Sequence, residues 1–157
     1  MKLLIISDSH GNIANLKHVV GFAKTIKAGA VVHCGDWDNK ESVDTVLSFG
    51  IPLYTILGNA DIDHEIEDTL KFQAKKFEPD ILKFEIDGRK IGVIHQMTKD
   101  IMPKFESTNI VFSGHYHSKE EKEINFTKFV RPGAIINGNN FAVYETANNR
   151  VEFFADV

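Results

Sequence analysis

The chain contains very little cysteine and very little arginine. Cys34 is the only cysteine, so no disulfide can form within the chain, which favours a reducing compartment. The arginines are Arg89, Arg131 and Arg150, which leaves no arginine cluster to bind phosphate. With Lys+Arg 18 against Asp+Glu 22, the formal net charge is −4, so we expect no general nucleic-acid binding. Divalent cations would have to supply any concentrated positive charge.

The sequence also lacks long hydrophobic runs. Its first six residues hold one lysine among apolar residues before Ser7, which is too short for a signal peptide. No stretch approaches the length of about 20 residues that a membrane span needs. We therefore expect a cytoplasmic protein with no membrane partner. A length of 157 residues fits one domain, 1–157, while the oligomeric state stays open and a homo-oligomer is possible.

Hydrophobic periodicity predicts an α/β fold. Apolar runs at 2–7, 30–34 and 51–57 alternate with helical patterns at 13–26, 40–49 and 62–75, which is typical of a parallel sheet. Asp87-Gly88 then separates two runs in a strong hairpin signal. The second half is predicted to be mostly antiparallel, with strands at 81–86, 90–95, 110–113, 123–126, 128–130, 141–145 and 151–154 and a short helix at 98–105. The pattern indicates two packed sheets with helices outside.

Metal-competent side chains follow the ends of five of these apolar runs. They are Asp8 and His10, Asp36, Asn59, His95, and His115 with His117. Taken singly, each of these residues can have a purely structural role. Asp8, for example, can cap a turn, and His10 can be a solvated surface residue. Their recurrence at strand ends, where α/β sheets hold ligands, favours one coordination site. Carboxylate, amide oxygen and imidazole suit Mn²⁺, Fe, Co²⁺, Ni²⁺ or Zn²⁺ better than an all-oxygen Ca²⁺ site.

The remaining histidines, the cysteine and the tryptophan have structural interpretations. Cys34 lies inside an apolar run and is predicted to be a small core residue. His33 is predicted to be a hydrogen-bonded core histidine, and His18 a surface residue. His64 could touch a substrate, although a surface position without substrate contact is favoured. Trp37 either packs at the rim of the site or belongs to the core.

Five ordered motifs resemble those of the calcineurin-like metallophosphoesterases, most of all the small single-domain phosphodiesterases of the YfcE type. The motifs are Asp8-x-His10, Gly35-Asp36, Gly58-Asn59-x-Asp61, His95 and Gly114-His115-x-His117. The resemblance spans residues 3–134. It implies a four-layer α/β/β/α sandwich, with two mixed β-sheets flanked by helices.

The resemblance also implies two divalent transition-metal ions, with Mn first and Ni, Fe, Co or Zn as alternatives. One ion would be held by Asp8, His10, Asp36 and His117, and the other by Asp36, Asn59, His95 and His115. Asp36 would bridge the two ions, because one carboxylate can serve both metals of a dinuclear site.

The implied activity is that of a metal-dependent phosphoric ester hydrolase acting on a small-molecule phosphoester, in the first place a phosphodiesterase. A hydroxide bridging the metals would attack phosphorus. The residues assigned to catalysis are Asp36, Asn59, His115 and Asp61, with Asn59 orienting a phosphate oxygen and Asp61 ordering the site. Two alternatives stay open: a phosphomonoesterase, and a non-catalytic interaction scaffold like the retromer subunit of this fold. The filled ligand positions favour catalysis.

Two positions depart from the family pattern. Many members carry a histidine that assists the leaving group where this chain has Ala60. Without that general acid, esters with good leaving groups, such as aryl esters, should suffer least. Gln96 replaces a usual glycine, and it could narrow the pocket or reach a substrate oxygen.

Overall fold

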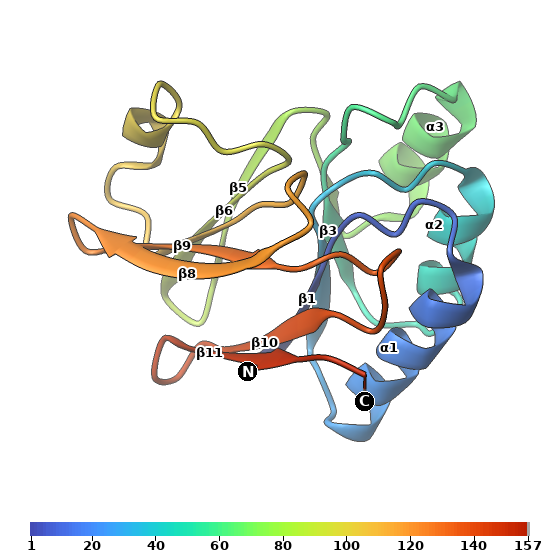
Figure 1. The fold of residues 1–157 in the computed structure, drawn as a ribbon, viewed down its shortest axis with the longest axis horizontal. Coiled ribbons are helices and arrows are strands. Elements are labelled where there is room, and N and C mark those ends of the chain that lie inside the picture. Colours follow the sequence, from blue (N-terminus) through green and yellow to red (C-terminus); the bar gives the residue numbers. More distant parts are fainter. Residues whose placement is uncertain (157) are drawn as a thin grey trace.

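The computed structural model describes residues 1–156, which form two stacked β-sheets with helices against one outer face (Figure 1). In chain order the elements are β1 (Lys2–Ile6), α1 (Ile13–Thr25), β2 (Ala30–His33), α2 (Lys40–Leu47), β3 (Leu53–Thr55), α3 (His64–Gln73), β4 (Lys76–Phe77), β5 (Ile81–Ile86), β6 (Arg89–Ile94), the 3-10 helix η1 (Met102–Phe105), β7 (Ile110–Phe112), β8 (Lys119–Ile124), β9 (Thr127–Pro132), β10 (Phe141–Glu145) and β11 (Arg150–Phe154). The first sheet has the order β11-β10-β1-β2-β3-β4, and the second has the order β5-β6-β7-β9-β8. Both sheets are mixed, as predicted.

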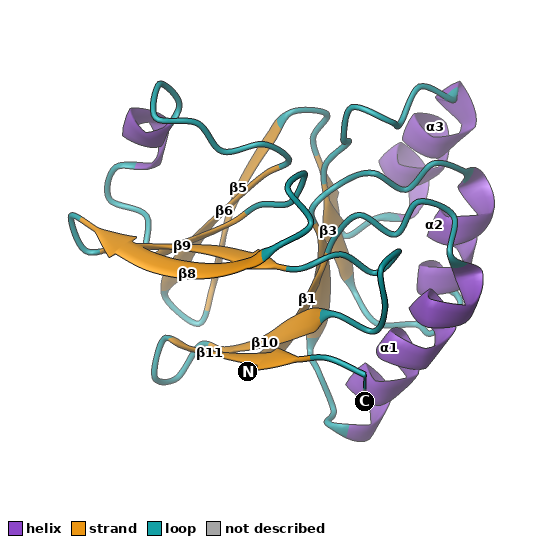
Figure 2. Cartoon of the chain, viewed as in Figure 1, coloured by secondary structure: helices purple, strands orange, loops and turns teal. Residues whose placement is uncertain are grey.

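The central strands of the first sheet, β1, β2 and β3, are buried on both faces because nearly all of their residues are apolar. Leu4 and Ile6 of β1 pack under α1, α2 and α3, which lie together on one side in Figure 2. Leu3 and Ile5 point the other way and pack against the second sheet. Successive strand residues face opposite sides of the sheet. The continuous Leu/Ile run of β1 therefore contributes both to the core under the helices and to the core between the sheets.

Each of the three α-helices begins at a side-chain cap, directly after a loop that leaves the first sheet. Asn12, Asn39 and Asp63 accept hydrogen bonds from the backbone N–H groups of residues 15, 42 and 65. Asn and Asp are preferred at this position because their short side chains can accept these N–H groups. The caps fix the far ends of the loops that carry the candidate site residues.

The second sheet begins with the predicted hairpin. Asp87 and Gly88 have φ values of 52° and 76°, the left-handed conformation that a two-residue turn between β5 and β6 requires. Strands β6, β7 and β9 are parallel to one another. Their carboxyl ends therefore lie at the same edge of the sheet.

The fourth layer, on the outer face of the second sheet, consists of the segment around η1. Phe105 packs there with Ile94, Val111 and Phe129. The helix predicted at 98–105 is reduced to this 3-10 helix, in which Pro103 occupies one of the first positions. Proline cannot donate a backbone hydrogen bond, so it is tolerated in a first turn and not in a helix interior.

The clearest differences from the predicted strands lie at β8, β9 and β4. The hairpin predicted at 123–126 and 128–130 is longer, because β8 and β9 pair from Lys119 with Pro132 to Ile124 with Thr127. Its turn is Asn125-Phe126, with φ values of 50° and 67°. β8 lies at a sheet edge with mostly exposed, charged side chains, so it carries no apolar alternation to detect. The short β4 was not predicted either.

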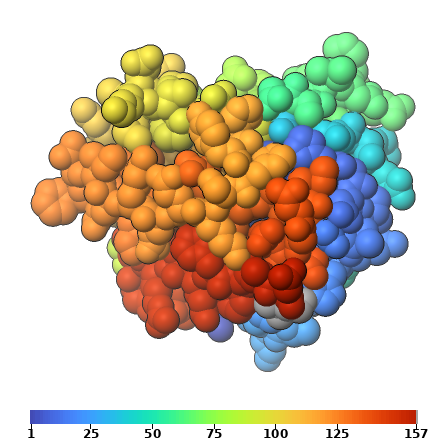
Figure 3. All heavy atoms as spheres, in the orientation of Figure 1, coloured from blue at the N-terminus to red at the C-terminus, as the bar shows by residue number. Residues whose placement is uncertain are grey.

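Within residues 1–156, no helix combines the length and the apolar character needed to span a membrane. The C-terminal hairpin β10–β11 pairs with β1, so the end of the described chain completes the sheet that its beginning starts. In Figure 3 this hairpin (red) lies below the orange β8–β9 hairpin.

Candidate metal centre

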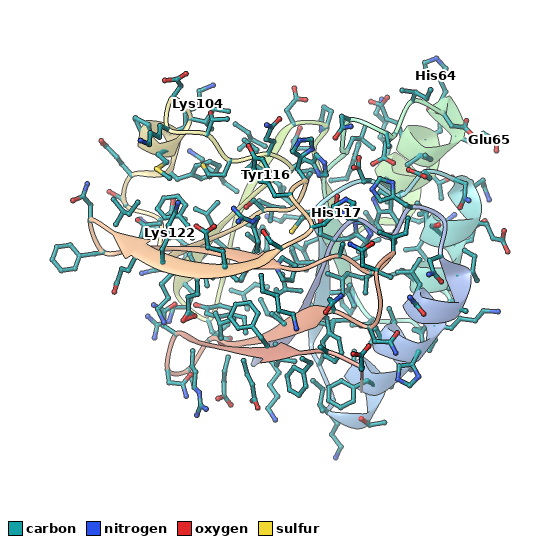
Figure 4. All side chains as sticks on the ribbon, viewed as in Figure 1. His64, Glu65, Lys104, Tyr116, His117 and Lys122 are labelled. Carbon is teal, nitrogen blue, oxygen red and sulfur yellow. The ribbon has the colours of Figure 1, made fainter. Side chains whose placement is uncertain are left out.

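All seven candidate ligands lie where the carboxyl ends of the strands of both sheets meet. Asp8 and His10 follow β1, Asp36 follows β2, Asn59 follows β3, His95 follows β6, and His115 and His117 follow β7. Backbone hydrogen bonds join these loops, with Asp8 N–H donating to Gly35 C=O at 3.0 Å and Gly114 N–H donating to His95 C=O at 2.8 Å. His117 lies near the middle of the molecule, between the two sheets (Figure 4).

Two overlapping groups of ligand atoms are compact enough to hold an ion. One atom each from Asp8, His10 and His117, and one each from Asp8, Asp36 and His95, lie within 4.8 Å of one another. Asp36 Oδ2 is 3.3 Å from His10 Nε2 and 3.2 Å from His95 Nε2. The Asp36 carboxylate thus faces the imidazoles of both halves of the cluster.

Asn59 and His115 complete the arrangement from the outer side. His115 Nδ1 and Asn59 Oδ1 are 3.1 Å apart, and the backbone N–H of His115 donates to Asp8 Oδ2 at 3.1 Å. The His115 ring meets the His95 ring edge-on, with centroids 5.3 Å apart. Every predicted ligand therefore contacts at least one other member of the cluster.

Three buried polar atoms in the cluster have no hydrogen-bond partner among the described residues: Asp8 Oδ1, His10 Nε2 and His95 Nε2. Buried polar atoms are normally paired. His95 Nδ1 is 2.7 Å from the Cys34 carbonyl, which can only accept, so this nitrogen carries the proton in a neutral ring. Its Nε2 then presents a lone pair to a carboxylate oxygen, and a cation between them resolves that repulsion. The donor set fits divalent metal ions.

The pKa shifts of Asp36 and His95 also indicate a site that favours positive charge. Burial alone would raise the pKa of Asp36, but the close approach of His95, the backbone N–H of Ala60 and the nearby His10 lower the pKa to about 2. Burial would lower the pKa of His95, but the contacts with Asp36 and with the Cys34 carbonyl outweigh it and raise the pKa. Both shifts favour a positive charge between His95 and Asp36, where a cation would lie.

The loops that carry the cluster have strained backbones. Asp8, His10, Asp36, His115 and His117 all have φ between 42° and 73°. Such left-handed conformations cost roughly 1–3 kcal/mol each in non-glycine residues and gather at functional sites. Asp61 helps to hold two of the loops, because its carboxylate accepts the N–H groups of Asp36, Trp37, Asp38 and Gly58 at 2.7–2.9 Å. This geometry fits the ordering role predicted for Asp61.

Sequence reasoning missed three residues that support the cluster. Asp38 Oδ1 is 3.0 Å from His10 Nδ1, which turns the other ring nitrogen of His10 toward Asp36. Ser7 Oγ donates to Asp8 Oδ2 at 2.5 Å, and Ser9 Oγ is 3.0 Å from His33 Nε2. These contacts depend on loop conformations for which the sequence gives no periodic signal.

Several structural interpretations from sequence are confirmed. Cys34, His33 and Trp37 are fully buried, and the His33 ring stacks on Trp37 with centroids 3.6 Å apart. His18 is exposed on α1. His64 is exposed at the start of α3, far from His117 in Figure 4. Gln96 Nε2 donates to Tyr116 Oη at 2.9 Å, so it bridges the ends of β6 and β7 above the cluster.

His33→Phe is expected to destabilise the protein and to weaken metal binding. Gly35 N–H donates to His33 Nδ1 at 3.1 Å, so His33 Nε2–H donates to Ser9 Oγ, and the ring ties together the loops that carry Asp8 and Asp36. Phenylalanine keeps the stacking on Trp37 but leaves the Gly35 N–H unpaired, at about 1–3 kcal/mol, and removes one of the two hydrogen bonds of Ser9 Oγ. Denaturant unfolding measures the loss, and an unchanged midpoint would remove this positioning role.

The same variant makes a pH test possible. Burial lowers the pKa of His33 well below 6.5, so the unfolded chain binds this proton and the folded chain does not. The resulting stability is present above pH 6.5 and is lost as pH falls below it, by up to about 1.4 kcal/mol per pH unit. We expect the unfolding free energy of the wild type to fall more steeply below pH 6.5 than that of His33→Phe. Parallel curves would show that His33 does not contribute.

Comparison with known proteins identifies relatives across the chain. A family model for the calcineurin-like phosphoesterase superfamily domain matches residues 1–149. Phosphodiesterase MJ0936 of Methanocaldococcus jannaschii is 23% identical over 138 residues, which cover 85% of this chain and 83% of the relative.

Solved structures share the fold along the whole length. An archaeal phosphodiesterase superposes with a TM-score of 0.90 at 20% identity, covering 99% of both chains. YfcE, a phosphoesterase from E. coli, has a TM-score of 0.76 at 14% identity, and Vps29 from Chaetomium thermophilum has 0.69 at 14%, each covering 100% of both chains. These matches confirm the predicted fold class.

Proposed function

Because the chain belongs to the calcineurin-like phosphoesterase superfamily, we propose that it is a divalent-metal-dependent phosphodiesterase. The observation that carries this proposal is the group of buried, unpaired ligand atoms that converge between the two sheets. The matching relative from Methanocaldococcus jannaschii is a phosphodiesterase, which supports a diester as the substrate class.

Two ions would share the cluster, with Mn²⁺ as the first candidate and Ni, Fe, Co or Zn as alternatives. Asp8, His10, Asp36 and His117 would hold one ion, and Asp36, Asn59, His95 and His115 the other. The position of Asp36 Oδ2 near both His10 Nε2 and His95 Nε2 supports Asp36 as the shared ligand. When bound, such a pair of cations lowers the pKa of a water and offsets negative charge on a phosphoryl group.

The protein's own residues position the substrate and the ligands. Asn59 is exposed, and its Oδ1 faces His115, so its side-chain N–H₂ can donate to a phosphoryl oxygen. Asp61 acts through the backbone N–H groups that it binds, and so keeps Asp36 and Gly58 in place. The methyl side chain of Ala60 cannot protonate a leaving group. Esters with good leaving groups are therefore the preferred substrates.

Two other functions make distinct predictions. A phosphomonoesterase would hydrolyse p-nitrophenyl phosphate faster than the corresponding diester. A non-catalytic scaffold is compatible with the fold, which Vps29 shares, because fold alone does not set function. The unpaired ligand atoms favour catalysis over the scaffold, since a scaffold has no need of them.

Removal of metal is expected to abolish hydrolysis reversibly. Protein treated with a chelator should lose its activity on bis(p-nitrophenyl) phosphate, and added Mn²⁺ should restore it, because the chain has no arginine cluster that could replace the cations. The assay follows p-nitrophenolate release, with p-nitrophenyl phosphate as the monoester comparison. Activity that survives full metal removal would contradict the proposal, and an inert metal-loaded protein would favour the scaffold.

We further propose that residues 1–157 act as one domain, because β10 and β11 join the sheet that β1 begins. A cytoplasmic location is supported by the single, buried cysteine, which fits a reducing compartment.

A further inference from the structure

A cleft opens beside the candidate metal centre and leads away from it. It has a volume of about 540 Å³, within the range of small-molecule sites. Two of the candidate ligands, Asn59 and His95, are among its lining residues. The β4–β5 connection contributes Asp80, Ile101 lies directly before η1, and Lys104 lies within η1.

The walls of this cleft are apolar and its rim is polar without net charge. Leu57, Pro79, Ile81, Ile94 and Ile101 line it. Asp80 and Lys104, both exposed, place one negative and one positive charge at its edge, together with the amide of Gln96. Asp61 also borders it, but its carboxylate is already bonded to four backbone N–H groups. Such a surface suits an uncharged ring and offers no cluster of positive charge for a second phosphate.

A second cavity is smaller and has more charged side chains in its lining. It has a volume of about 110 Å³, and its lining includes Glu120, Lys122 and Arg131. None of its lining residues is among the seven candidate ligands. The larger cleft, which Asn59 and His95 line, can therefore take an organic group attached to a phosphate at the centre.

We propose that this cleft binds the retained ester group of the substrate, and that this group is an uncharged ring such as a nucleobase or an aryl group. The inference rests on the proposed phosphodiesterase function and names its substrate class: diesters that carry a nucleoside or an aryl group, in preference to small acyclic ones. Contact of one ring with the apolar wall should favour such esters about tenfold or more, since even a methylene contributes about 10–200-fold in an apolar pocket.

Two diesters with the same leaving group test the inference. Thymidine 5′-(p-nitrophenyl) phosphate and methyl p-nitrophenyl phosphate both release p-nitrophenolate, so they differ only in the retained group. With Mn²⁺-loaded wild type, kcat/KM should be about tenfold higher for the thymidine ester. Asp80→Trp, at an exposed rim position, should fill the cleft and lower this ratio about tenfold, and Ile101→Asp should lower it similarly. Glu85→Trp, an exposed position on β5 outside the cleft, should leave the ratio unchanged.

Equal rates for the two esters, or a ratio that Asp80→Trp leaves unchanged, would overturn the cleft assignment while leaving the phosphodiesterase function in place. If neither ester is hydrolysed, the proposed function fails, and calorimetry decides the cleft separately. Thymidine 5′-monophosphate should then bind the Mn²⁺-loaded protein about tenfold more tightly than inorganic phosphate, and Asp80→Trp should remove the difference. Equal affinities for the two would overturn the inference.

Discussion

Asp36→Asn is expected to lower kcat/KM for phosphodiester hydrolysis by about a thousandfold or more, which corresponds to about 4 kcal/mol of transition-state stabilisation. Asp36 Oδ1 accepts the N–H of Ala60 at 2.9 Å, and an asparagine oxygen can keep that bond. Asp36 Oδ2 faces His10 and His95, and an amide in its place removes the negative charge between the two halves of the cluster. Activity and metal content should therefore fall together.

The measurement pairs kcat/KM on bis(p-nitrophenyl) phosphate with metal content by elemental analysis. Asp44→Asn is the matched control, because Asp44 is exposed on α2 and pairs only with Lys40 among the ion pairs of the described residues. It should keep both activity and metal. An Asp36→Asn protein with normal turnover and a full complement of metal would refute the bridging role of Asp36.

Gly58→Ala is expected to reduce activity about a hundredfold, because a displacement of about 1 Å at a catalytic group can cost that much. A Cβ on Gly58 would overlap Oδ1 and the backbone N of Asp36 and would lie 2.8 Å from its Cγ. Two of these atoms belong to the Asp36 side chain and one to the backbone, so no simple rotation relieves the contact. Overpacking of this kind also lowers the free energy of unfolding by about 1–3 kcal/mol.

Gly21→Ala is the control for this prediction. A Cβ on Gly21 would lie 3.9 Å from Phe49 Cε1, an ordinary contact, and Gly21 is inside α1. Alanine is favoured over glycine there by up to about 1 kcal/mol, so this variant should gain stability and keep its activity. The pair separates an effect on the site from a general effect of added bulk. Wild-type activity in Gly58→Ala would show that the Gly58–Asp36 contact does not hold the centre.

The fold could be predicted wherever an element buries a regular apolar pattern. The Leu/Ile run of β1, the apolar stripe of α1 and the Asp87-Gly88 turn each carry a local signal that agrees with the final structure. The beginning of β8, from Lys119, gave no such signal, because it pairs along one edge through its backbone while its charged side chains face water. The 98–105 region was predicted as a short helix, and Pro103 limits it to the 3-10 helix η1.

The candidate site could be predicted because its members follow the ends of parallel strands, and parallel strands end at one rim. The structure brings all seven of them together, while their assignment as metal ligands stays a prediction. The supporting contacts of Asp38, Ser7 and Ser9 could not be predicted. Asp38 is left-handed, and Ser7 and Ser9 adjoin the left-handed Asp8, so their side-chain directions depend on the loop conformation and not on a periodic pattern.

Crystals grown with Mn²⁺ and measured at the manganese absorption edge would test the central claim most directly. We expect two anomalous peaks per chain, one beside Asp8, His10 and His117 and the other beside Asn59, His95 and His115, with Asp36 touching both. The loaded protein should show no peak of comparable height elsewhere. Absence of any peak within bonding distance of Asp8 or His95, at saturating Mn²⁺, would contradict the account.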